Sequence, residues 1–485
     1  MKKFRIISLL LALLTLASCG QTGPSDPSGT SDTTPEVTTE PTPTKLEYPY
    51  EFKDYGGKTF TFLNCVDKLW SGSNHILDYE SLNGDTVSDE IYNRARDTEA
   101  NFGVKIEVIK DEYWSLYGNI QKQVLAGEPT YDAAYAPLKS TMVGEYALDL
   151  MKIDSLHLDS EWWNGNFIDQ AMIEGKLYSV LDYVNMMGYS YGNVMYFNKE
   201  LAENHNLDML YDAVREGKWT YDMMAQYMKA VSSLNGDEKF TYSLDANCIF
   251  GFGVQHEEGT MTVLNGSGER LVTKNKDGIP ELSTNVERFS NAYSKLCQIL
   301  SPDGMTIMYE GQKSEQRGAK TFKAGRALFY QGNLGNSGDA FRELEFEYGV
   351  IPAPKYDEAQ ADYYTMASEY ALSLVVPKTA SDPDMTGRVL DYMAYRGKVD
   401  VIPALQVQLC YKGMRDDDSI EMFETILSTL SLDIGYMFGW TQSLVKTLCG
   451  DDMLNGNDKF ASSFAAQKDQ IKSAIEKTLT AMNEN

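Results

Sequence analysis

Two adjacent tryptophans, Trp162 and Trp163, are the first residues in this sequence that suggest a chemistry, because the polar run Asp159–Glu161 stands directly before them. Aromatic rings stack on the C–H faces of a sugar, while carboxylates, amides and hydroxyls bind its hydroxyl groups. Neighbouring side chains on an extended segment point to opposite sides. We therefore expect one of the two indoles to face a cleft that binds a sugar.

Tyrosines fit the same chemistry, but they do not prove it. The chain is 12% aromatic and holds 31 tyrosines, and aromatic rings also fill protein cores. Tyr191 lies just before a predicted strand that includes Asn193, where its ring could stack on a ligand or pack in a core. The sequence thus offers binding residues without fixing which of them line a site.

Signals for bond-making chemistry are weak. Gly57-Lys58-Thr59 lacks the upstream glycine of a P-loop, because Phe52 holds that place, and neither H-E-x-x-H nor G-x-S-x-G occurs. The four scattered histidines argue against a zinc site. We therefore expect no enzyme activity, no metal and no cofactor. A surface glycoside hydrolase or lyase is the enzyme alternative, because a catalytic carboxylate pair could lie among the 70 acidic residues.

Charge and cysteine content narrow the partners further. The net charge of −27 argues against nucleic acid, which is bound through clustered Lys and Arg. Besides Cys19 there are five widely spaced cysteines, and such an odd, sparse set is no disulfide framework. We expect mostly buried thiols, with up to two disulfides left open. These cysteines are Cys65, Cys248, Cys297, Cys410 and Cys449.

The N-terminus predicts export. Lys2, Lys3 and Arg5 precede an apolar run at 6–17 that is too short to span a bilayer. The run ends in Leu16-Ala17-Ser18-Cys19, which resembles the lipobox of bacterial lipoproteins; the alternative is a plain secretory signal with a chance cysteine. The resemblance implies that 1–18 is a signal peptide and that Cys19 is acylated. Residues 19–46, rich in Thr, Pro and Ser, would then form a disordered stalk.

The remaining pattern alternates strands and helices. Thr59–Leu63 alternates as a strand does, Asp85 or Thr86 can cap a helix that ends at Phe102, and Val104–Val108 alternates again, which predicts a parallel crossover. Further strands are expected at 131–136, 174–180, 192–198, 327–330, 348–351 and 371–376. Further helices are expected at 115–126, 285–299, 385–396, 420–430 and 458–482, and two more are expected to begin at 199 and at 220. Residues 255–282 are predicted to be loops. The pattern favours two α/β lobes with a ligand where they meet.

Eight short motifs follow one another along this part of the chain. They are Tyr55-Gly-Gly-Lys-Thr-Phe-Thr-Phe62, Asn93-Arg-Ala-Arg-Asp-Thr-Glu-Ala-Asn-Phe-Gly-Val-Lys-Ile106, Tyr131-Asp-Ala-Ala-Tyr135, Met195-Tyr-Phe-Asn-Lys-Glu-Leu201, Gly217-Lys-Trp-Thr220, Phe322-Lys-Ala-Gly-Arg-Ala-Leu328, Tyr348-Gly-Val-Ile-Pro-Ala-Pro354 and Val376-Pro377. Together, in this order, they resemble the bacterial extracellular solute-binding proteins of carbohydrate ABC importers, relatives of the maltose-binding protein.

The resemblance implies an α/β fold like that of periplasmic binding proteins, with two lobes, a hinge and a ligand cleft between the lobes. Residues 47–155 and 368–413 would form the N-terminal lobe, and 156–367 and 414–485 the C-terminal lobe. It also implies ligand-binding roles for Trp70 or Asn64 after the first strand, for Glu369 near the hinge, and for Trp440.

The same resemblance implies partners and a location. We expect a monomer outside the cytoplasm, held at the cell membrane by the lipid on Cys19, that passes a carbohydrate to membrane-spanning ABC permease subunits. A receptor for another solute, such as a peptide, is the other alternative.

Overall fold

The computed structural model describes residues 46–67, 75–241, 243, 245–254, 256–300, 305–307, 317–338, 340–414 and 416–484. The predicted signal peptide, Cys19, nearly all of the predicted stalk and Trp70 lie outside these residues. From Leu46 on, the chain forms one compact unit with its own core. Within the described part of the chain, no helix is long and apolar enough to cross a membrane.

The first sheet has four strands in the order β12-β3-β1-β2, with β1 parallel to both β2 and β3 and with β12 antiparallel to β3. Between β1 and β2 runs helix α1 (Thr86–Phe102), which Asp85 caps by accepting a hydrogen bond from the backbone N–H of Ser88. Gly103 ends the helix in the left-handed region, at φ 56°. The predicted strand–helix–strand crossover is confirmed.

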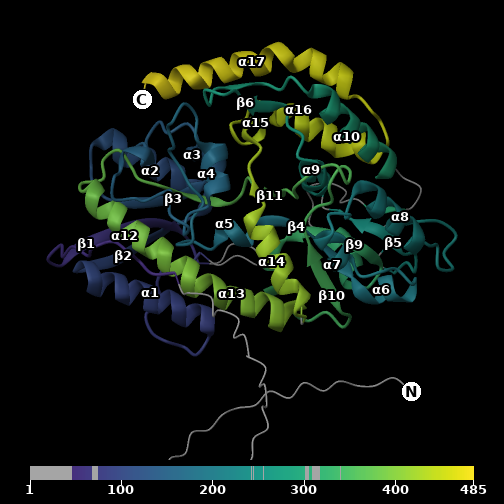
Figure 1. Ribbon diagram of the computed structural model, residues 1–485, viewed down its shortest axis with the longest axis horizontal. Helices are drawn as coiled ribbons and strands as arrows, with labels where there is room; N and C mark the ends of the chain where they lie inside the picture. Colours follow the sequence, from purple (N-terminus) through teal and green to yellow (C-terminus); the bar gives the residue numbers. More distant parts are fainter. Residues whose placement is uncertain are drawn as a thin grey trace, which may run out of the picture. The chain divides into compact units, whose positions relative to one another are not determined.

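The second sheet is larger and mixed, in the order β13-β11-β4-β9-β5-β8, and β10 pairs antiparallel with the later part of β4, off this path. At its centre β4 and β9 run antiparallel, with Asn193 opposite Asn333 and Met195 opposite Gln331. Every residue of β4 is buried, because helices cover the sheet. Figure 1 shows the first sheet with α1, α2 and α12 to the left and the second sheet with α6 to α9 to the right.

The strands are β1 (Lys58–Cys65), β2 (Val104–Asp111), β3 (Ala133–Pro137), β4 (Gly192–Asn198), β5 (Phe250–Gly253), β6 (Val272–Lys274), β7 (Pro280–Leu282), β8 (Thr306–Ile307), β9 (Ala327–Asn333), β10 (Tyr348–Ile351), β11 (Thr365–Ala367), β12 (Leu372–Val375) and β13 (Leu430–Ser431). Besides α1, the helices are α2 (Leu116–Ala126), α3 (Leu138–Thr141), α4 (Gly165–Ala171), α5 (Met187–Ser190), α6 (Lys199–Asn204), α7 (Leu210–Arg215), α8 (Tyr221–Val231), α9 (His256–Gly266), α10 (Val286–Ile299), α11 (Arg317–Lys323), α12 (Pro383–Arg396), α13 (Ile402–Leu409), α14 (Asp418–Ser428), α15 (Ile434–Met437), α16 (Gln442–Thr447) and α17 (Phe460–Glu484). Short helical turns are η1 (Tyr113–Ser115), η2 (Leu150–Lys152), η3 (Leu334–Gly338), η4 (Gly397–Val401), η5 (Cys410–Met414) and η6 (Leu448–Asp452).

Two sequence predictions of local structure are wrong. The expected strand at 174–180 makes only isolated bridges, one of them between Val180 and Leu374. The expected loops at 255–282 contain α9 and the β6–β7 hairpin. Gly, Thr and Asn made α9 look irregular, but Met261, Val263 and Leu264 bury themselves in the core. Tertiary packing overrides weak helix propensity there.

The predicted division into lobes stays a prediction. Val180 exchanges two backbone hydrogen bonds with Leu374 of the first sheet, and Asp182 accepts from the hydroxyl of Tyr135 on β3 at 3.0 Å. Val180 and Asp182, which the prediction assigns to the C-terminal lobe, therefore contact the first sheet.

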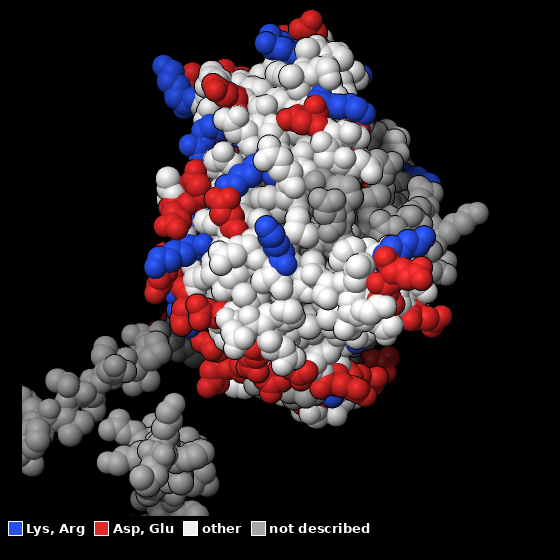
Figure 2. Space-filling model, turned by 90° about the vertical axis from the view of Figure 1, so that its right-hand side faces the viewer, with Lys and Arg blue, Asp and Glu red and all other residues white. Residues whose placement is uncertain are grey.

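Helix α17 lies across the top of the body in Figure 1, packed on α10, α16 and β7. At its end, Lys176 donates from Nζ to the carbonyl oxygen of Met482 at 2.7 Å. The face in Figure 2 has Lys and Arg scattered among Asp and Glu, with acidic side chains gathered along its lower edge. The five cysteines from Cys65 to Cys449 are buried, as predicted, and they are free, which answers the disulfide question that the sequence left open.

Candidate ligand-binding cavity

A cavity of about 520 Å³ lies over the ends of β4 and β9 in the second sheet. This volume falls in the range of small-molecule binding sites. Most of its lining comes from β4, β9, α9, α11 and the segments that follow β9 and β11. The lining residues are Tyr191, Asn193, Glu258, Ala319, Lys323, Tyr330, Gln331, Gly332, Asn333, Asn336, Ala340, Phe341, Ser368 and Tyr370.

Amide side chains form the floor of this ligand cavity. Because β4 and β9 are antiparallel neighbours, their polar ends meet, and Gln331 donates from Nε2 to Oδ1 of Asn193 at 3.2 Å. Asn336 turns back and accepts from the backbone N–H of Asn333 at 3.0 Å. Gly332 permits this close approach, since a Cβ there would lie 2.5 Å from Oδ1 of Asn336.

Two acceptor atoms at this floor lack a hydrogen-bond partner in the described part of the chain. Oε1 of Gln331 and Oδ1 of Asn333 are buried and have no hydrogen-bond partner among the described residues. Leaving a buried acceptor unpaired costs about 1–3 kcal/mol. Once these side chains turn toward the cavity, a hydroxyl or N–H group of a ligand would satisfy such atoms, so the floor favours a ligand rich in donors.

Glu258 adds a carboxylate from the first turn of α9. It is half-buried and accepts a hydrogen bond from Oγ of Ser368 at 3.4 Å. Burial raises the pKa of Glu258 and the charge of Glu369 raises it further, although hydrogen bonds from Asn193 and Ser368 oppose the shift. The group gives the cavity an acceptor for hydroxyl groups.

Aromatic rings stand beside these polar groups. Tyr191 is 5% exposed, and the rings of Tyr330 and Phe341 lie 5.6 Å apart at 78°, an edge-to-face pair. Burial, and then the charge of Glu258, raises the pKa of Tyr330, so its hydroxyl stays protonated as a donor. Rings, amides and a carboxylate around one cavity are the set of groups that sugar recognition requires.

Among the sequence-predicted site residues, Tyr191 lines this cavity. Glu369 does not line the cavity, but its two neighbours in the chain, Ser368 and Tyr370, both do. Contacts of Glu369 therefore hold this segment in place. Its carboxylate accepts from Tyr436 Oη, Gln442 Nε2 and Lys446 Nζ at 2.9, 2.9 and 2.8 Å. Burial would raise the pKa of Glu369, but the hydrogen bond and charge of Lys446 outweigh it and lower the pKa. Lys139 of α3 approaches the same carboxylate at 3.5 Å.

Trp162 and Trp163 lie elsewhere, in the core beside α12. Both donate from Nε1 to the same oxygen of Asp391, at 2.9 and 3.0 Å, and they are 3% and 4% exposed. The premise that they lie on an extended segment is wrong, because residues 160–163 form a turn. A turn lets neighbouring side chains approach one carboxylate from the same side.

Asn64 and Trp440 are also packed outside the cavity lining. Asn64, at the end of β1, is 1% exposed and accepts from Nδ2 of Asn185 at 3.2 Å. Trp440 is 6% exposed, stacks on Phe438, and donates from Nε1 to Oγ1 of Thr478 on α17 at 2.9 Å. Trp70 lies outside the described residues.

Most residues at the floor of the ligand cavity were not among those that the sequence predicted. The strand predicted at 327–330 continues to Asn333, and the polar Gln331 and Asn333 stand at its carboxyl end, where ligands often bind in α/β folds. That polar end was a usable signal. Glu258 gave no signal, because its segment was expected to be a loop.

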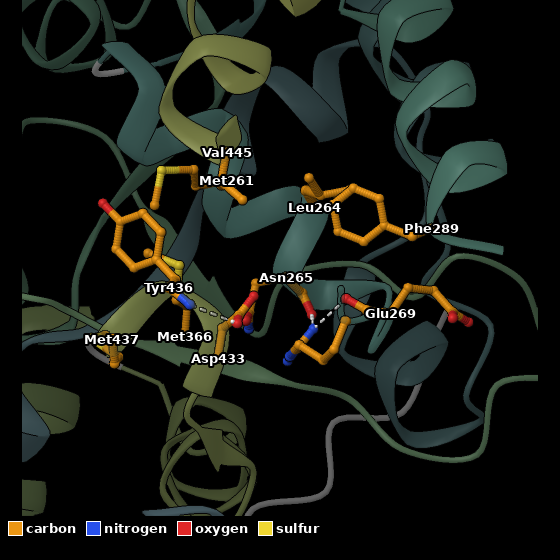
Figure 3. A pocket seen from close by; sticks show the side chains of 11 residues that line it. Met261, Leu264, Asn265, Glu269, Phe289, Met366, Asp433, Tyr436, Met437 and Val445 are labelled. Atoms are coloured by element: carbon orange, nitrogen blue, oxygen red, sulfur yellow. Dashed lines mark hydrogen bonds between the residues drawn. The ribbon is translucent and has the colours of Figure 1, made fainter. Parts of the chain in front are cut away.

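A second cavity, near α9 and α15, is much smaller, at about 20 Å³, which is room for about one water. Figure 3 shows its residues, with the carboxylate of Asp433 accepting from the backbone N–H of Tyr436 at 3.0 Å. Burial raises the pKa of Asp433, and Arg270 opposes the shift. Among the described residues, no group of three or more His, Cys, Asp or Glu side chains could hold a metal ion.

No protein-family model and no curated protein sequence matches this chain. Solved structures do match. A sugar transporter from Rhizobium etli in an open conformation has a TM-score of 0.58 at 13% identity, over 85% of this chain and 99% of that one. The GacH receptor of Streptomyces glaucescens, solved unliganded and with acarbose, has a TM-score of 0.55 at 12% identity, over 87% and 99%.

A third match is an ABC substrate-binding protein from Listeria monocytogenes in complex with cycloalternan, with a TM-score of 0.52 at 15% identity, over 87% of this chain and 99% of that one. At these identities the likeness shows the fold. The predicted α/β fold of two lobes, like that of periplasmic binding proteins, is confirmed.

Proposed function

We propose that this protein is an extracytoplasmic receptor that captures a sugar or oligosaccharide between its two lobes and delivers it to an ABC importer permease. The observation that carries the proposal is the composition of the ligand cavity, where unpaired amide oxygens, the Glu258 carboxylate and tyrosine rings surround one space. The structural neighbours include a sugar transporter, a receptor solved with acarbose and a substrate-binding protein solved with cycloalternan, which supports the same ligand class.

The proposed mechanism is capture by closure. A ligand shifts a two-state equilibrium only by its difference in affinity for the two states. A sugar seated over β4 and β9 would favour a closed arrangement if groups of the first lobe also touch it. Tyr191 and Tyr370 would stack on its rings, while Gln331, Asn333 and Glu258 would bind its hydroxyls.

The N-terminal part of the proposal concerns location. The positive residues, apolar run and Leu16–Cys19 of the sequence support cleavage before Cys19 and a lipid anchor there. A Thr/Pro/Ser stalk would lift a monomeric body from the membrane while leaving it able to dock on permease subunits. Mass spectrometry of the mature protein from its native host would test this part by the mass of its first residue.

The experiment for the whole proposal is thermal unfolding of residues 47–485, which form their own core, against mono- and oligosaccharides with peptides as controls. A ligand that binds only the native state raises the midpoint by mass action. We expect one sugar class to raise the midpoint and to be recovered unchanged. A shift with peptides alone would favour another solute, and turnover of the sugar would favour a glycoside hydrolase or lyase.

A further inference from the structure

Trp114 is an exposed tryptophan that no part of the proposed site yet uses. It lies in η1, between β2 and α2 of the first lobe, and it is 74% exposed. Single exposed apolar residues are normal on protein surfaces, so exposure alone says nothing about function. What distinguishes Trp114 is its neighbour.

The indole of Trp114 stands edge-to-face against the ring of Tyr370, with centroids 6.5 Å apart and planes at 87°. Tyr370 lines the ligand cavity. The preceding residue fixes this placement, because Tyr113 is 1% exposed and its hydroxyl donates to the carbonyl oxygen of Tyr370 at 3.0 Å. Trp114 is thus held at the edge of the cavity while most of its surface stays open.

The walls of the ligand cavity come mostly from around the second sheet, which makes the position of Trp114 near the first sheet informative. The lining residues come from β4, β9, α9, α11 and the segments joined to them, all around the second sheet, together with Ser368 and Tyr370 from the segment that leads back to the first sheet. Closure driven by a ligand requires contact with both lobes. Trp114 belongs to the first lobe and touches a wall residue of the cavity.

We propose that Trp114 is the stacking surface of a second sugar subsite, which takes the next ring of an oligosaccharide whose first ring lies in the ligand cavity. This inference rests on the proposed function and sharpens it, since it names an oligosaccharide rather than a single sugar as the ligand. The indole face offers an apolar plane of the kind that the C–H face of a sugar covers. Tyr370 joins the two subsites.

The test compares chain lengths on the same protein. Residues 47–485 are titrated by calorimetry with linear tetrasaccharides of glucose, mannose, xylose and N-acetylglucosamine, each beside its own monosaccharide. We expect one tetrasaccharide to bind better than its monosaccharide. Trp114→Ala should weaken that tetrasaccharide about tenfold, by loss of one aromatic stack, and leave the monosaccharide unchanged. Trp114→Phe should restore most of the loss.

A matched control is Leu125→Ala, because Leu125 is a large apolar residue of the same lobe that is 72% exposed. It should leave both affinities unchanged. Intrinsic fluorescence adds a readout that a purely structural residue would not move: the tetrasaccharide should change the emission of the wild type, and Trp114→Phe should remove that part of the change. Equal unfolding midpoints for all variants would show that they fold.

Several outcomes separate the inference from the proposed function. If Trp114→Ala binds the tetrasaccharide as well as the wild type does, or if it loses mono- and tetrasaccharide equally, the second subsite is refuted and the receptor function stands. The same holds if the wild type binds the monosaccharide as tightly as the tetrasaccharide. If the wild type binds none of these sugars and none in the wider panel, the receptor function for sugars fails, and the inference fails with it.

Discussion

Two regions of this molecule are built from the same kinds of residue, yet only one of them is a cavity. Around Asp391 of α12, beside the first sheet, lie Trp162, Trp163, Tyr48 and His157, which we name the Asp391 cluster. Around Glu258 of α9, beside the second sheet, lie Tyr191, Tyr330 and the amides of the ligand cavity. Each region combines aromatic rings with a carboxylate.

The two regions differ in whether their buried polar atoms already have hydrogen-bond partners. Asp391 is fully buried and accepts from both tryptophans, from the Tyr48 hydroxyl at 3.1 Å and from the backbone N–H of His157 at 3.2 Å. Beside Glu258, by contrast, Gln331 keeps a buried oxygen without a partner among the described residues. Aromatic and acidic composition therefore does not distinguish a filled cluster from a cavity; open volume and unpaired acceptors do.

The largest effect that this contrast predicts is on stability. Asp391→Ala should lower the free energy of unfolding by about 3–5 kcal/mol, because several buried donors lose their acceptor at once. Sugar affinity should not change. Urea denaturation and calorimetric titration measure the two quantities.

The control for this change is Asp384→Ala on the same helix. The side chain of Asp384 is 42% exposed, pairs with Lys53 and Arg388, and accepts from the Tyr55 hydroxyl at 3.0 Å, so its loss should cost about 1–2 kcal/mol, less than the loss of the fully buried Asp391. If Asp391→Ala proved no more costly than the control, or if it abolished sugar binding in a protein that is still folded, the Asp391 cluster would not be the structural core that we describe.

The next effect is on binding. Gln331→Ala should raise the Kd for the sugar roughly tenfold to a hundredfold, because an unreplaced hydrogen bond to a buried partner is worth about 1–3 kcal/mol. Calorimetry with the sugar found in the thermal screen measures the change.

Gln123→Ala is the matched control, since Gln123 of α2 is 5% exposed and both ends of its amide are bound, to the Tyr131 backbone N–H at 3.2 Å and to Thr379 Oγ1 at 2.8 Å. It should cost about 1–3 kcal/mol of stability and leave Kd unchanged. Equal Kd values for both variants and the wild type would remove Gln331 from the site.

Much of the fold could be predicted from the sequence because its signals are local. A capping Asp85, an alternating β2 and a helix ending at a glycine are each decided within a few residues. The segment at 255–282 shows the limit of this approach. Helix α9 has Thr, Asn and Gly at many positions, and it is helical because its apolar residues find a core that other parts of the chain provide.

The site was harder to predict, since it depends on what distant segments leave open. Trp162 and Trp163 are as aromatic as any sugar-binding pair, but a turn directs both toward Asp391. Gln331 is buried like many core residues, and nothing in the sequence around it tells that its oxygen has no partner among the residues that the structure describes. Tyr191 was identified because it directly precedes a strand that was itself predictable.

The smallest predicted effect concerns Trp440, for which sequence and structure suggest different roles. The resemblance implies a ligand contact, whereas the structure packs the indole on Phe438 and bonds it to Thr478. Trp440→Phe keeps the stacking and removes one hydrogen bond, so it should cost about 0.5–1.5 kcal/mol of stability and leave Kd unchanged.

Thr478 retains a partner in this variant, because its hydroxyl already donates to the Ala474 carbonyl oxygen at 3.0 Å. Thr478→Val should cost a similar amount and add little to Trp440→Phe in a double mutant, since both remove the same bond. A loss of sugar affinity in Trp440→Phe without a loss in Thr478→Val would instead place this ring against the ligand. The region around Trp440 would then belong with the ligand cavity and not with the filled Asp391 cluster.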